Sequence, residues 1–378
     1  MIRSEHKLDL FLKKRKIRKI SFTFYFGFVA CLFSLYGQVR TNFDEAYAHH
    51  EKIAIYQTES RVQSVDKIEE TRGRSQNLSS KKVDGNLQLC INEKPVLHYR
   101  YEMTHPPEGV DSIFRKSGYI HPIITLKGDT LTRIQPPDHY HHYGLWGPWT
   151  HTRIDTTLVD FWNLGEGMGT VLFKEFKATD SDDLSLSFTA SQEHIDLKTE
   201  KNPHIALKEE LEVRLWDLGR EDRYMFDYKT TFESPLKTGI LFEAYRYGGG
   251  IGLRFNERWK ADNCSVLTSE GNDRLSADGT NARWCIVSGA SSSGKGTNGI
   301  LFMSHPENRM HPEPMRIWPI DANEGRGDMF FEFCPIRYKE WQIEPNKKYG
   351  LNYRMVVFDG ELKVEEAEAY WRAFANHK

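Results

Sequence analysis

The sequence predicts an all-β fold, a large antiparallel β-sandwich followed by one C-terminal helix. Apolar and polar residues alternate over 211–215 and 224–230, a period of two that puts successive side chains on opposite faces of a strand. More short apolar runs follow one another between turns of Gly, Asp, Asn and Pro, without helices between them. These runs cover residues 97–103, 119–126, 169–176, 184–190, 240–245, 300–303, 330–334 and 351–358.

The main helical pattern lies near the end of the sequence. Apolar residues recur at helical spacing among Glu and Ala, at Val364, Ala367, Tyr370, Trp371 and Phe374. We expect this helix to pack across the end of the sandwich as a lid.

The composition is that of a globular protein with balanced charge. The 378 residues are 39% hydrophobic, which is enough for a sizeable core. The 51 Lys and Arg nearly cancel the 53 Asp and Glu, so we expect neither a basic face nor a nucleic-acid partner.

The N-terminal region predicts export to the periplasm or secretion. A cluster of Lys and Arg at 13–19 precedes an uncharged apolar run at 20–36, which is the order of a secretory signal. Cleavage after Gly37 would make 1–37 the signal peptide. Two alternatives stay open, a membrane anchor formed by the apolar run and a lipid anchor at Cys31. We predict no dedicated membrane domain beyond this segment.

The remaining sequence divides into two regions. Residues 38–84 are polar and of mixed charge, which predicts a linker, and 85–378 form the predicted sandwich domain. Four cysteines lie beyond the N-terminal segment. They predict either disulfides, with Cys264 and Cys285 the first pair to test, or four buried thiols, the other two being Cys90 and Cys334.

The densest group of reactive side chains lies in residues 136–149. Prolines and glycines favour a structured loop there, on which His139, His141 and His142 can converge. Histidine transfers protons near neutral pH, so these three are the candidate catalytic residues. The alternative is that they brace a buried loop. His139 and His141 could also bind a divalent metal with His151, but without a specific metal motif we predict no cofactor.

Three further regions offer partners for these histidines. Tyr245, Arg246 and Tyr247 precede three glycines, which favour a bulge or a close backbone approach. Glu270 lies in a Gly/Asn turn and is the leading candidate carboxylate, although a solvated turn is equally consistent with the sequence. Prolines predict an extended loop over 305–319, which either borders the same cleft or connects rigid elements.

Several of these stretches, taken in order, resemble an uncharacterised bacterial family labelled "methane oxygenase PmoA", over nearly all of residues 85–378. The matching residues are 106–110, 118–122, 138–142, 160–163, 245–249, 267–271, 282–284 and 312–314. A methane monooxygenase subunit is embedded in the membrane, and this sequence has no later apolar run of spanning length, so we do not expect methane oxidation. The resemblance implies proteins that process sugars, with a sandwich similar to that of aldose mutarotases and related polysaccharide lyases. It carries over no catalytic residues.

We therefore expect an exported carbohydrate-active enzyme that acts on a sugar or glycoside by cleavage, elimination or epimerisation. His139, His141 or His142 would transfer the proton, with Glu270 as carboxylate partner. The alternatives are a non-catalytic glycan-binding protein and a His-ligated metal enzyme. The ligand would be a sugar or oligosaccharide, held by Trp146, Trp149, Trp162, Tyr245, Arg246, Tyr247, Arg254, Arg283 and His305.

Overall fold

The computed structural model describes residues 77–376, so the predicted signal peptide and most of the predicted linker lie outside the described residues. The sheet begins before residue 85, where we had placed the start of the domain. Strand β1 (Leu78–Val83) pairs with β2 (Asn86–Ile91). Leu78 and Ser80 are buried and alternate with partly exposed residues, a pattern that the polar composition of this stretch conceals.

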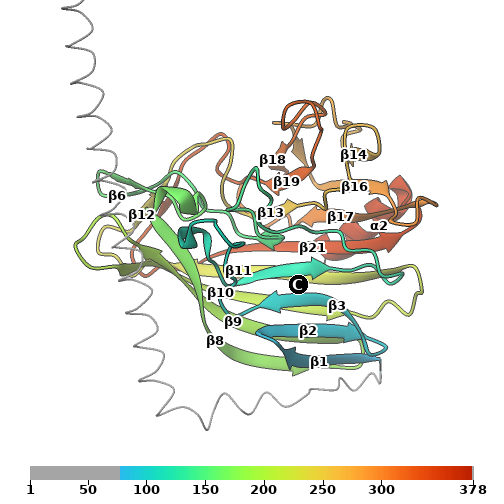
Figure 1. Cartoon of the computed structure of the whole chain (residues 1–378), viewed down its shortest axis with the longest axis horizontal. Coiled ribbons are helices and arrows are strands. Elements are labelled where there is room, and N and C mark those ends of the chain that lie inside the picture. Colours follow the sequence, from blue (N-terminus) through green and yellow to red (C-terminus); the bar gives the residue numbers. More distant parts are fainter. Residues whose placement is uncertain (1–76, 377–378) are drawn as a thin grey trace, which may run out of the picture.

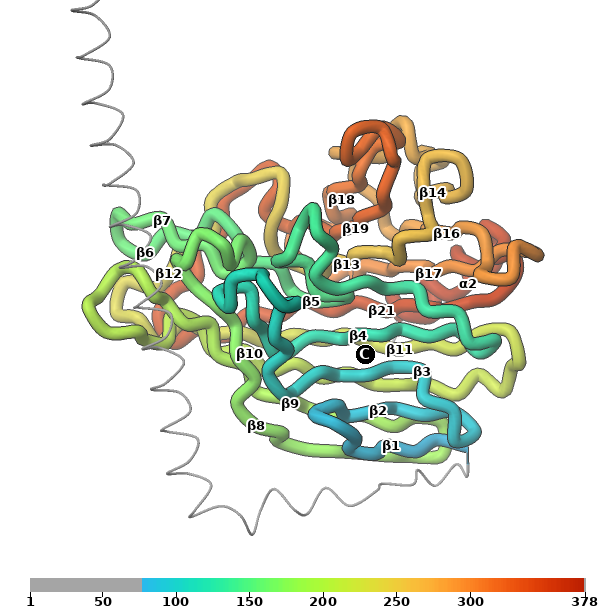
Figure 2. Tube along the Cα trace, in the orientation of Figure 1, coloured from blue at the N-terminus to red at the C-terminus, as the bar shows by residue number. Residues whose placement is uncertain are grey.

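The described strands form three antiparallel sheets (Figure 1, Figure 2). The first has nine strands in the order β1-β2-β3-β4-β5-β13-β19-β18-β15. Its further members are β3 (Lys94–Arg100), β4 (Tyr119–Ile123), β5 (Leu145–Trp146), β13 (Ile251–Arg254), β19 (Phe330–Phe333), β18 (Glu313–Ile317) and β15 (Asn281–Ala282).

The second sheet has eight strands in the order β14-β16-β17-β21-β11-β10-β9-β8. It contains the longest strands, which are hairpin neighbours along much of the chain. They are β14 (Cys264–Thr268), β16 (Trp284–Ala290), β17 (Thr297–Ser304), β21 (Tyr349–Asp359), β11 (Arg223–Glu233), β10 (His204–Trp216), β9 (Ser185–Asp196) and β8 (Gly169–Ser181).

A small third sheet lies at one end of the molecule. Its order is β20-β12-β6-β7, from β20 (Trp341–Ile343), β12 (Ile240–Phe242), β6 (Thr152–Ile154) and β7 (Thr157–Val159). The short 3-10 helices η1 (Ser112–Phe114) and η2 (Leu164–Glu166) lie in connecting loops.

The two large sheets pack face to face around one main core. In Figure 1 strands β1 to β3 lie over β8 to β10. The Tyr99 ring of β3 lies 4.9 Å from the Phe188 ring of β9, and the Tyr224 hydroxyl of β11 donates to the Ile124 carbonyl at 2.9 Å. The predicted all-β sandwich with a C-terminal helix is confirmed, and every predicted apolar run overlaps a strand.

Helix α2 (Val364–Ala375) forms where helical spacing predicted it, but it packs on a different surface. It covers the outer face of the eight-stranded sheet, not the end of the sandwich. Ala367 and Phe374 pack against Leu301, Met303 and neighbouring residues of β16 and β21. Ile300 and Phe302 of β17 face the main core, whereas Leu301 and Met303 face the helix. Because both faces of this strand are buried, its sequence is an uninterrupted apolar run without alternation.

Two other predictions are resolved by the structure. The predicted loop over 305–319 contains β18, whose five residues are all buried, so the prolines did not prevent a strand. Pro314 is accommodated because its carbonyl accepts a hydrogen bond from the Cys334 amide while no amide donor is required of it. All four described cysteines are free, buried thiols, so the alternative without disulfides is the correct one.

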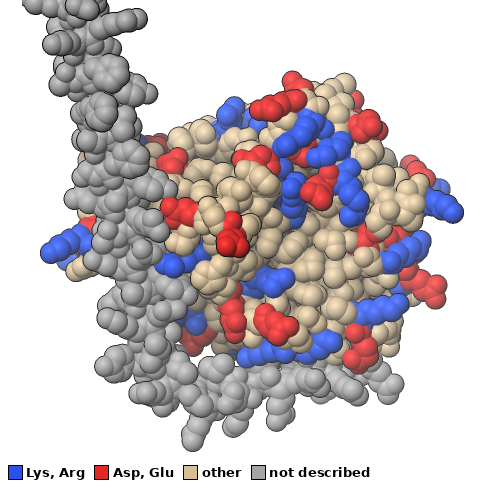
Figure 3. Space-filling model, in the orientation of Figure 1, with Lys and Arg blue, Asp and Glu red and all other residues tan. Residues whose placement is uncertain are grey.

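The described residues include no helix that is long and apolar enough to cross a membrane. Figure 3 shows acidic and basic side chains intermingled over the visible face of the domain.

A buried carboxyl group links the two large sheets. Glu313 of β18 is fully buried, and Tyr353 of β21 donates to it at 2.9 Å. The Asn308 amide donates at 3.0 Å and the Ser304 hydroxyl of β17 is also bonded to it. Burial raises the pKa of Glu313 to about 7 although these hydrogen bonds act in the opposite direction.

Replacing this carboxyl group should change how stability depends on pH. The folded chain keeps the Glu313 proton up to about pH 7, whereas the unfolded chain loses it near the ordinary value of 4.5. Stability supplied by the neutral group is therefore complete below the unfolded pKa and is lost as pH rises through the folded one. Urea denaturation measures this. Between the ordinary value of 4.5 and about pH 7, the free energy of unfolding of Glu313→Gln should rise relative to that of the wild type by about 1 kcal/mol per pH unit.

The matched control is Glu361→Gln, which changes an exposed residue. The free energy of unfolding of this variant should depend on pH in the same way as that of the wild type. A difference between Glu313→Gln and the wild type that stays constant across the same pH range would contradict the assignment.

Candidate functional site

A pocket of about 180 Å³ opens where the small sheet meets the β5, β13 and β18 part of the nine-stranded sheet. Its walls come from loops that are far apart in the sequence, before β5, before β6, after β7, between β12 and β13, and after β18. The lining residues are His139, His141, His142, Thr150, Trp162, Asn163, Tyr245, Tyr247 and Trp318.

Consecutive turns bring the three histidines together. The His139 amide bonds to the Pro136 carbonyl at 2.8 Å, and the His142 amide bonds to the His139 carbonyl at 3.0 Å. Gly144 ends the turn with φ of 62°, and a Cβ there would collide with the Ile120 carbonyl of β4. Glycine is thus required for the loop to lie against the sheet.

The imidazole rings form a compact group. His142 stacks on His139 with ring centroids 4.7 Å apart, and His141 meets His142 edge-on at 4.8 Å. Burial lowers the pKa of His141 to about 3 and that of His142 well below its ordinary value. Burial also lowers the pKa of His139 despite the adjacent Asp138 carboxylate. All three are therefore neutral at pH 7.

Asp138 fixes the proton position on His139. Its carboxylate lies 2.9 Å from Nδ1 of His139, and the His139 side chain is 29% exposed toward the pocket mouth. Burial alone would raise the pKa of Asp138, but His139 and Arg254 hold it below the ordinary value, so the group is ionised. Since a carboxylate accepts only, Nδ1 carries the hydrogen and Nε2 presents a lone pair.

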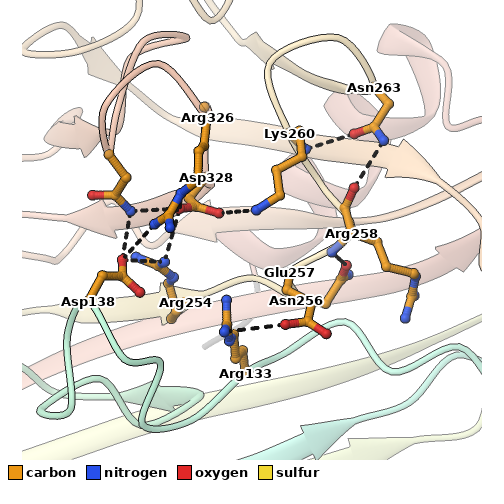
Figure 4. Close-up of polar contacts among 12 residues, drawn as sticks. Arg133, Asp138, Arg254, Asn256, Glu257, Arg258, Lys260, Asn263, Arg326 and Asp328 are labelled. Carbon is orange, nitrogen blue, oxygen red and sulfur yellow. Dashed lines mark hydrogen bonds and ion pairs between the residues drawn. The ribbon is translucent and has the colours of Figure 1, made fainter.

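Asp138 belongs to an ionic network beneath the pocket (Figure 4). Buried Arg254 donates to Asp138 at 3.0 Å and lies 3.6 Å from Asp328. Asp328 also pairs with Lys260 and Arg326. The network holds the His139 loop against β13 and against the loop that follows Trp318.

Cations back two aromatic walls. The Arg254 guanidinium lies 4.5 Å from the ring centroid of Trp318, and that of Arg316 lies 4.8 Å from the ring of Tyr247. The Tyr247 hydroxyl accepts hydrogen bonds from Arg316 at 2.9 Å and from Nε1 of Trp318 at 3.2 Å. Both of these partners are pure donors, so the hydroxyl hydrogen of Tyr247 remains available to a ligand.

A buried carboxylate organises the opposite wall. Asp160 accepts hydrogen bonds from the Trp162 and Asn163 amides, each at 2.8 Å, and from the Asn163 side-chain amide at 2.7 Å. The Thr150 hydroxyl is also bonded to Asp160. This acid holds three pocket residues in place without lining the pocket itself.

The structure brings part of the predicted site together. His139, His141, His142, Trp162, Tyr245 and Tyr247 line the pocket. Arg254 lies directly behind it, and buried Trp146 packs behind His142 with centroids 5.5 Å apart. His151 stacks on Tyr245 at 3.6 Å, and exposed Arg246 lies over the Tyr247 ring at 5.3 Å.

Other predicted residues lie elsewhere. Glu270 is 3.6 Å from Arg283, which pairs with Glu368 of α2, so both lie beside the helix and not in the pocket. His305 contacts the Phe374 ring of α2. Trp149 is buried in the main core against Phe242. The turn at 270 and the loop at 140 therefore do not form one site.

Sequence reasoning missed several residues of the site. Thr150, Asn163 and Trp318 line the pocket, and Asp160 and Asp328 support it. Asp160 and Asn163 carried a signal, since they occur in one of the stretches that support the family resemblance. Trp318 was not singled out, although it lies in the 305–319 segment, and the expectation that this segment borders the cleft holds at this residue.

No group of three or more His, Cys, Asp or Glu side chains among residues 77–376 is arranged to hold a metal ion. The predicted alternative set of His139, His141 and His151 is divided, because His151 stacks behind Tyr245 and does not line the pocket.

The fold and the pocket define an antiparallel β-sandwich protein with a site of neutral histidines and aromatic rings. The chain belongs to the family of unknown function DUF6807, whose model matches residues 86–372. The description of this family names no activity. The resemblance to the family labelled "methane oxygenase PmoA" stays a prediction from sequence, and methane oxidation is not expected. No curated protein matches the chain at a significant level.

Solved structures with similar β-architecture include sugar-active enzymes. Heparan sulfate lyase HepC from Pedobacter heparinus is 8% identical, with a TM-score of 0.34, and the match covers 86% of this chain but 43% of that one. The putative mutarotase YeaD from Salmonella typhimurium is 10% identical, with a TM-score of 0.37 and coverages of 79% and 99%. The GH36 α-galactosidase AgaA from Geobacillus stearothermophilus is 8% identical, with a TM-score of 0.35 and coverages of 74% and 40%. Similarity at this level concerns the arrangement of strands alone and does not assign an activity to this chain.

Removing the buried anchor of the pocket wall should destabilise the domain. Asp160→Ala would leave two backbone amides and two side-chain donors without their acceptor. We expect the free energy of unfolding to fall by about 3 kcal/mol. Urea denaturation measures this loss, and the exposed Asp183→Ala should stay within about 0.5 kcal/mol of the wild type. Equal stability of the two variants would exclude the anchoring role.

Proposed function

We propose that this protein is an exported carbohydrate-active enzyme that binds a sugar ring in the histidine pocket and acts on it by proton transfer, with His139 as the base. The observation that carries the proposal is the Asp138–His139 pair, at 2.9 Å, on the edge of an aromatic pocket. A carboxylate on Nδ1 orients the imidazole, stabilises the charge it acquires and leaves Nε2 to take a proton.

The pocket suits a ring that has both apolar and polar faces. Trp162, Trp318, Tyr245 and Tyr247 supply flat apolar surfaces, and Thr150 and Asn163 add polar atoms. Its volume of about 180 Å³ is below the roughly 300 Å³ at which pockets for drug-sized ligands begin. One sugar ring, free or at the end of a chain, matches this size.

Tyr247 completes the acid–base pair. Its hydroxyl accepts from Arg316 and Trp318, so its own hydrogen can be donated to an oxygen of the substrate. It therefore takes the place that the sequence had suggested for Glu270. In elimination or epimerisation His139 removes a proton from the sugar, and in hydrolytic cleavage it removes one from the attacking water, while Tyr247 protonates the departing or ring oxygen. Product analysis distinguishes these reactions.

Export is part of the proposal because of the basic cluster at 13–19 and the apolar run that follows it. These residues lie outside the described ones. Cell fractionation of the full chain tests this part independently of the pocket.

Loss of the imidazole should abolish turnover without unfolding the protein. Wild type, His139→Ala and the exposed control His105→Ala would be incubated with a panel of neutral and oxidised oligosaccharides, with products detected by mass spectrometry and NMR. We expect turnover by wild type and control, and a loss of about 10²–10⁴-fold in His139→Ala at a similar melting temperature. Turnover of His139→Ala at the wild-type rate would rule out the role, and binding without any product would favour the glycan-binding alternative.

The pH dependence of kcat/KM should identify the same group. Burial lowers the pKa of His139, so the basic form already predominates at neutral pH. Activity should fall as the pH drops through this lowered pKa, which puts the acid limb below the ordinary value of 6.5. An acid limb above that value would show that the rate-limiting base is another group.

A further inference from the structure

We infer that the pocket selects a neutral, hydroxyl-rich sugar and excludes sugars that carry a carboxylate or a phosphate. This inference rests on the proposed function and makes its substrate class specific. Two independent features carry it, the lack of free charge in the lining and the fixed directions of the hydrogen bonds.

The lining supplies no charge to balance an anion. Among the nine lining residues, all within the described chain, none is Lys, Arg, Asp or Glu. The nearest buried cations already have counter-charges, since Arg254 pairs with Asp138 at 3.0 Å and Arg316 pairs with Asp278 at 2.9 Å. Arg254 lies against the Trp318 ring, and Arg316 lies against the Tyr247 ring and donates to its hydroxyl, so neither guanidinium is itself part of the lining. An anion entering here would lose water without gaining a partner.

Neutral histidines extend this uncharged surface. Burial keeps the pKa of His141 at about 3 and that of His142 well below its ordinary range, so neither becomes a cation near pH 7. Arg246 is a cation near the rim, 5.3 Å from the Tyr247 ring centroid. It is exposed, so water and salt screen its charge.

Two buried or partly buried carboxylates determine the hydrogen-bond directions in the pocket. Asp160 binds the Asn163 side-chain amide, which leaves the Asn163 carbonyl oxygen as an acceptor. Asp160 also takes the hydroxyl hydrogen of fully buried Thr150, whose oxygen accepts from the Asn163 side-chain amide at 3.5 Å, so Thr150 adds no donor to the pocket. Asp138 takes the Nδ1 hydrogen of His139, so Nε2 accepts as well. Two polar groups on separate loops, the Asn163 carbonyl oxygen and Nε2 of His139, are thus fixed as acceptors.

Sugar hydroxyls match this pattern and carboxylates do not. A sugar hydroxyl can donate to either of these two acceptors and can also accept from the Tyr247 hydroxyl, whose hydrogen its protein partners leave available. A carboxylate has no hydrogen to donate, so in the same position it would place lone pairs against lone pairs. Losing one such hydrogen bond and burying an unpaired charge together predict at least about tenfold weaker binding.

Matched pairs of sugars test the inference on the full-length wild-type protein. The probes are the methyl glycosides of glucose, galactose and mannose, the uronic acid corresponding to each, and glucose 6-phosphate. Saturation-transfer NMR detects binding, and calorimetry at pH 7 gives Kd. For at least one pair, we expect the neutral sugar to bind at least about tenfold more tightly than its acid.

The variant Arg246→Gln distinguishes the contribution of the exposed rim charge to binding from that of the pocket lining. It should leave Kd of the neutral sugar within about twofold, because the exposed guanidinium contributes little at physiological ionic strength. An acid or phosphate that binds as tightly as its neutral partner, or more tightly, would overturn the selectivity while sugar binding itself stood. Binding of none of the probes would overturn the proposed function and the selectivity with it.

Discussion

The burial of Arg254 is the constraint around which the site is built. Its side chain is 1% exposed, and an ionised group in that position costs several kcal/mol unless it is paired. Asp138 and Asp328 supply counter-charges to its Nη2 from two loops that are distant in sequence, while its buried Nε and Nη1 have no hydrogen-bond partner among the described residues. Movement of either loop would remove one of these two counter-charges, so Arg254 holds the His139 loop and the loop after Trp318 together at the pocket, where the His139 and Trp318 ring centroids lie 5.0 Å apart.

A single buried carboxylate, Asp160, also holds several groups in place on the other wall of the pocket. Asp160 contacts the solvent hardly at all, yet its two oxygens satisfy the backbone at Trp162 and Asn163 and orient two side chains. The acids of this domain therefore act from behind the pocket surface. They decide which pocket atoms donate and which accept, while the surface that a ligand meets remains uncharged.

The sequence predicted the strands and the helix well because their signals are local. Alternation in β10 and β11 and helical spacing in α2 reflect one buried face each. It also identified the His139 loop, because three imidazoles between prolines and glycines are conspicuous. It placed Glu270 and Arg283 in the site incorrectly, since a carboxylate in a turn has the same local appearance whether it faces a cleft or, as here, a helix.

The sequence by itself determined the β-sandwich class, the terminal helix and the group of histidines, all of which depend on residues close together in the chain. Only the tertiary structure decided which distant residues join them. Trp318 reaches the pocket because β18 pairs with β19, and Glu270 is excluded because β14 pairs with β16. Pairing between remote strands depends on the packing of the whole core, and no short pattern of residues records it.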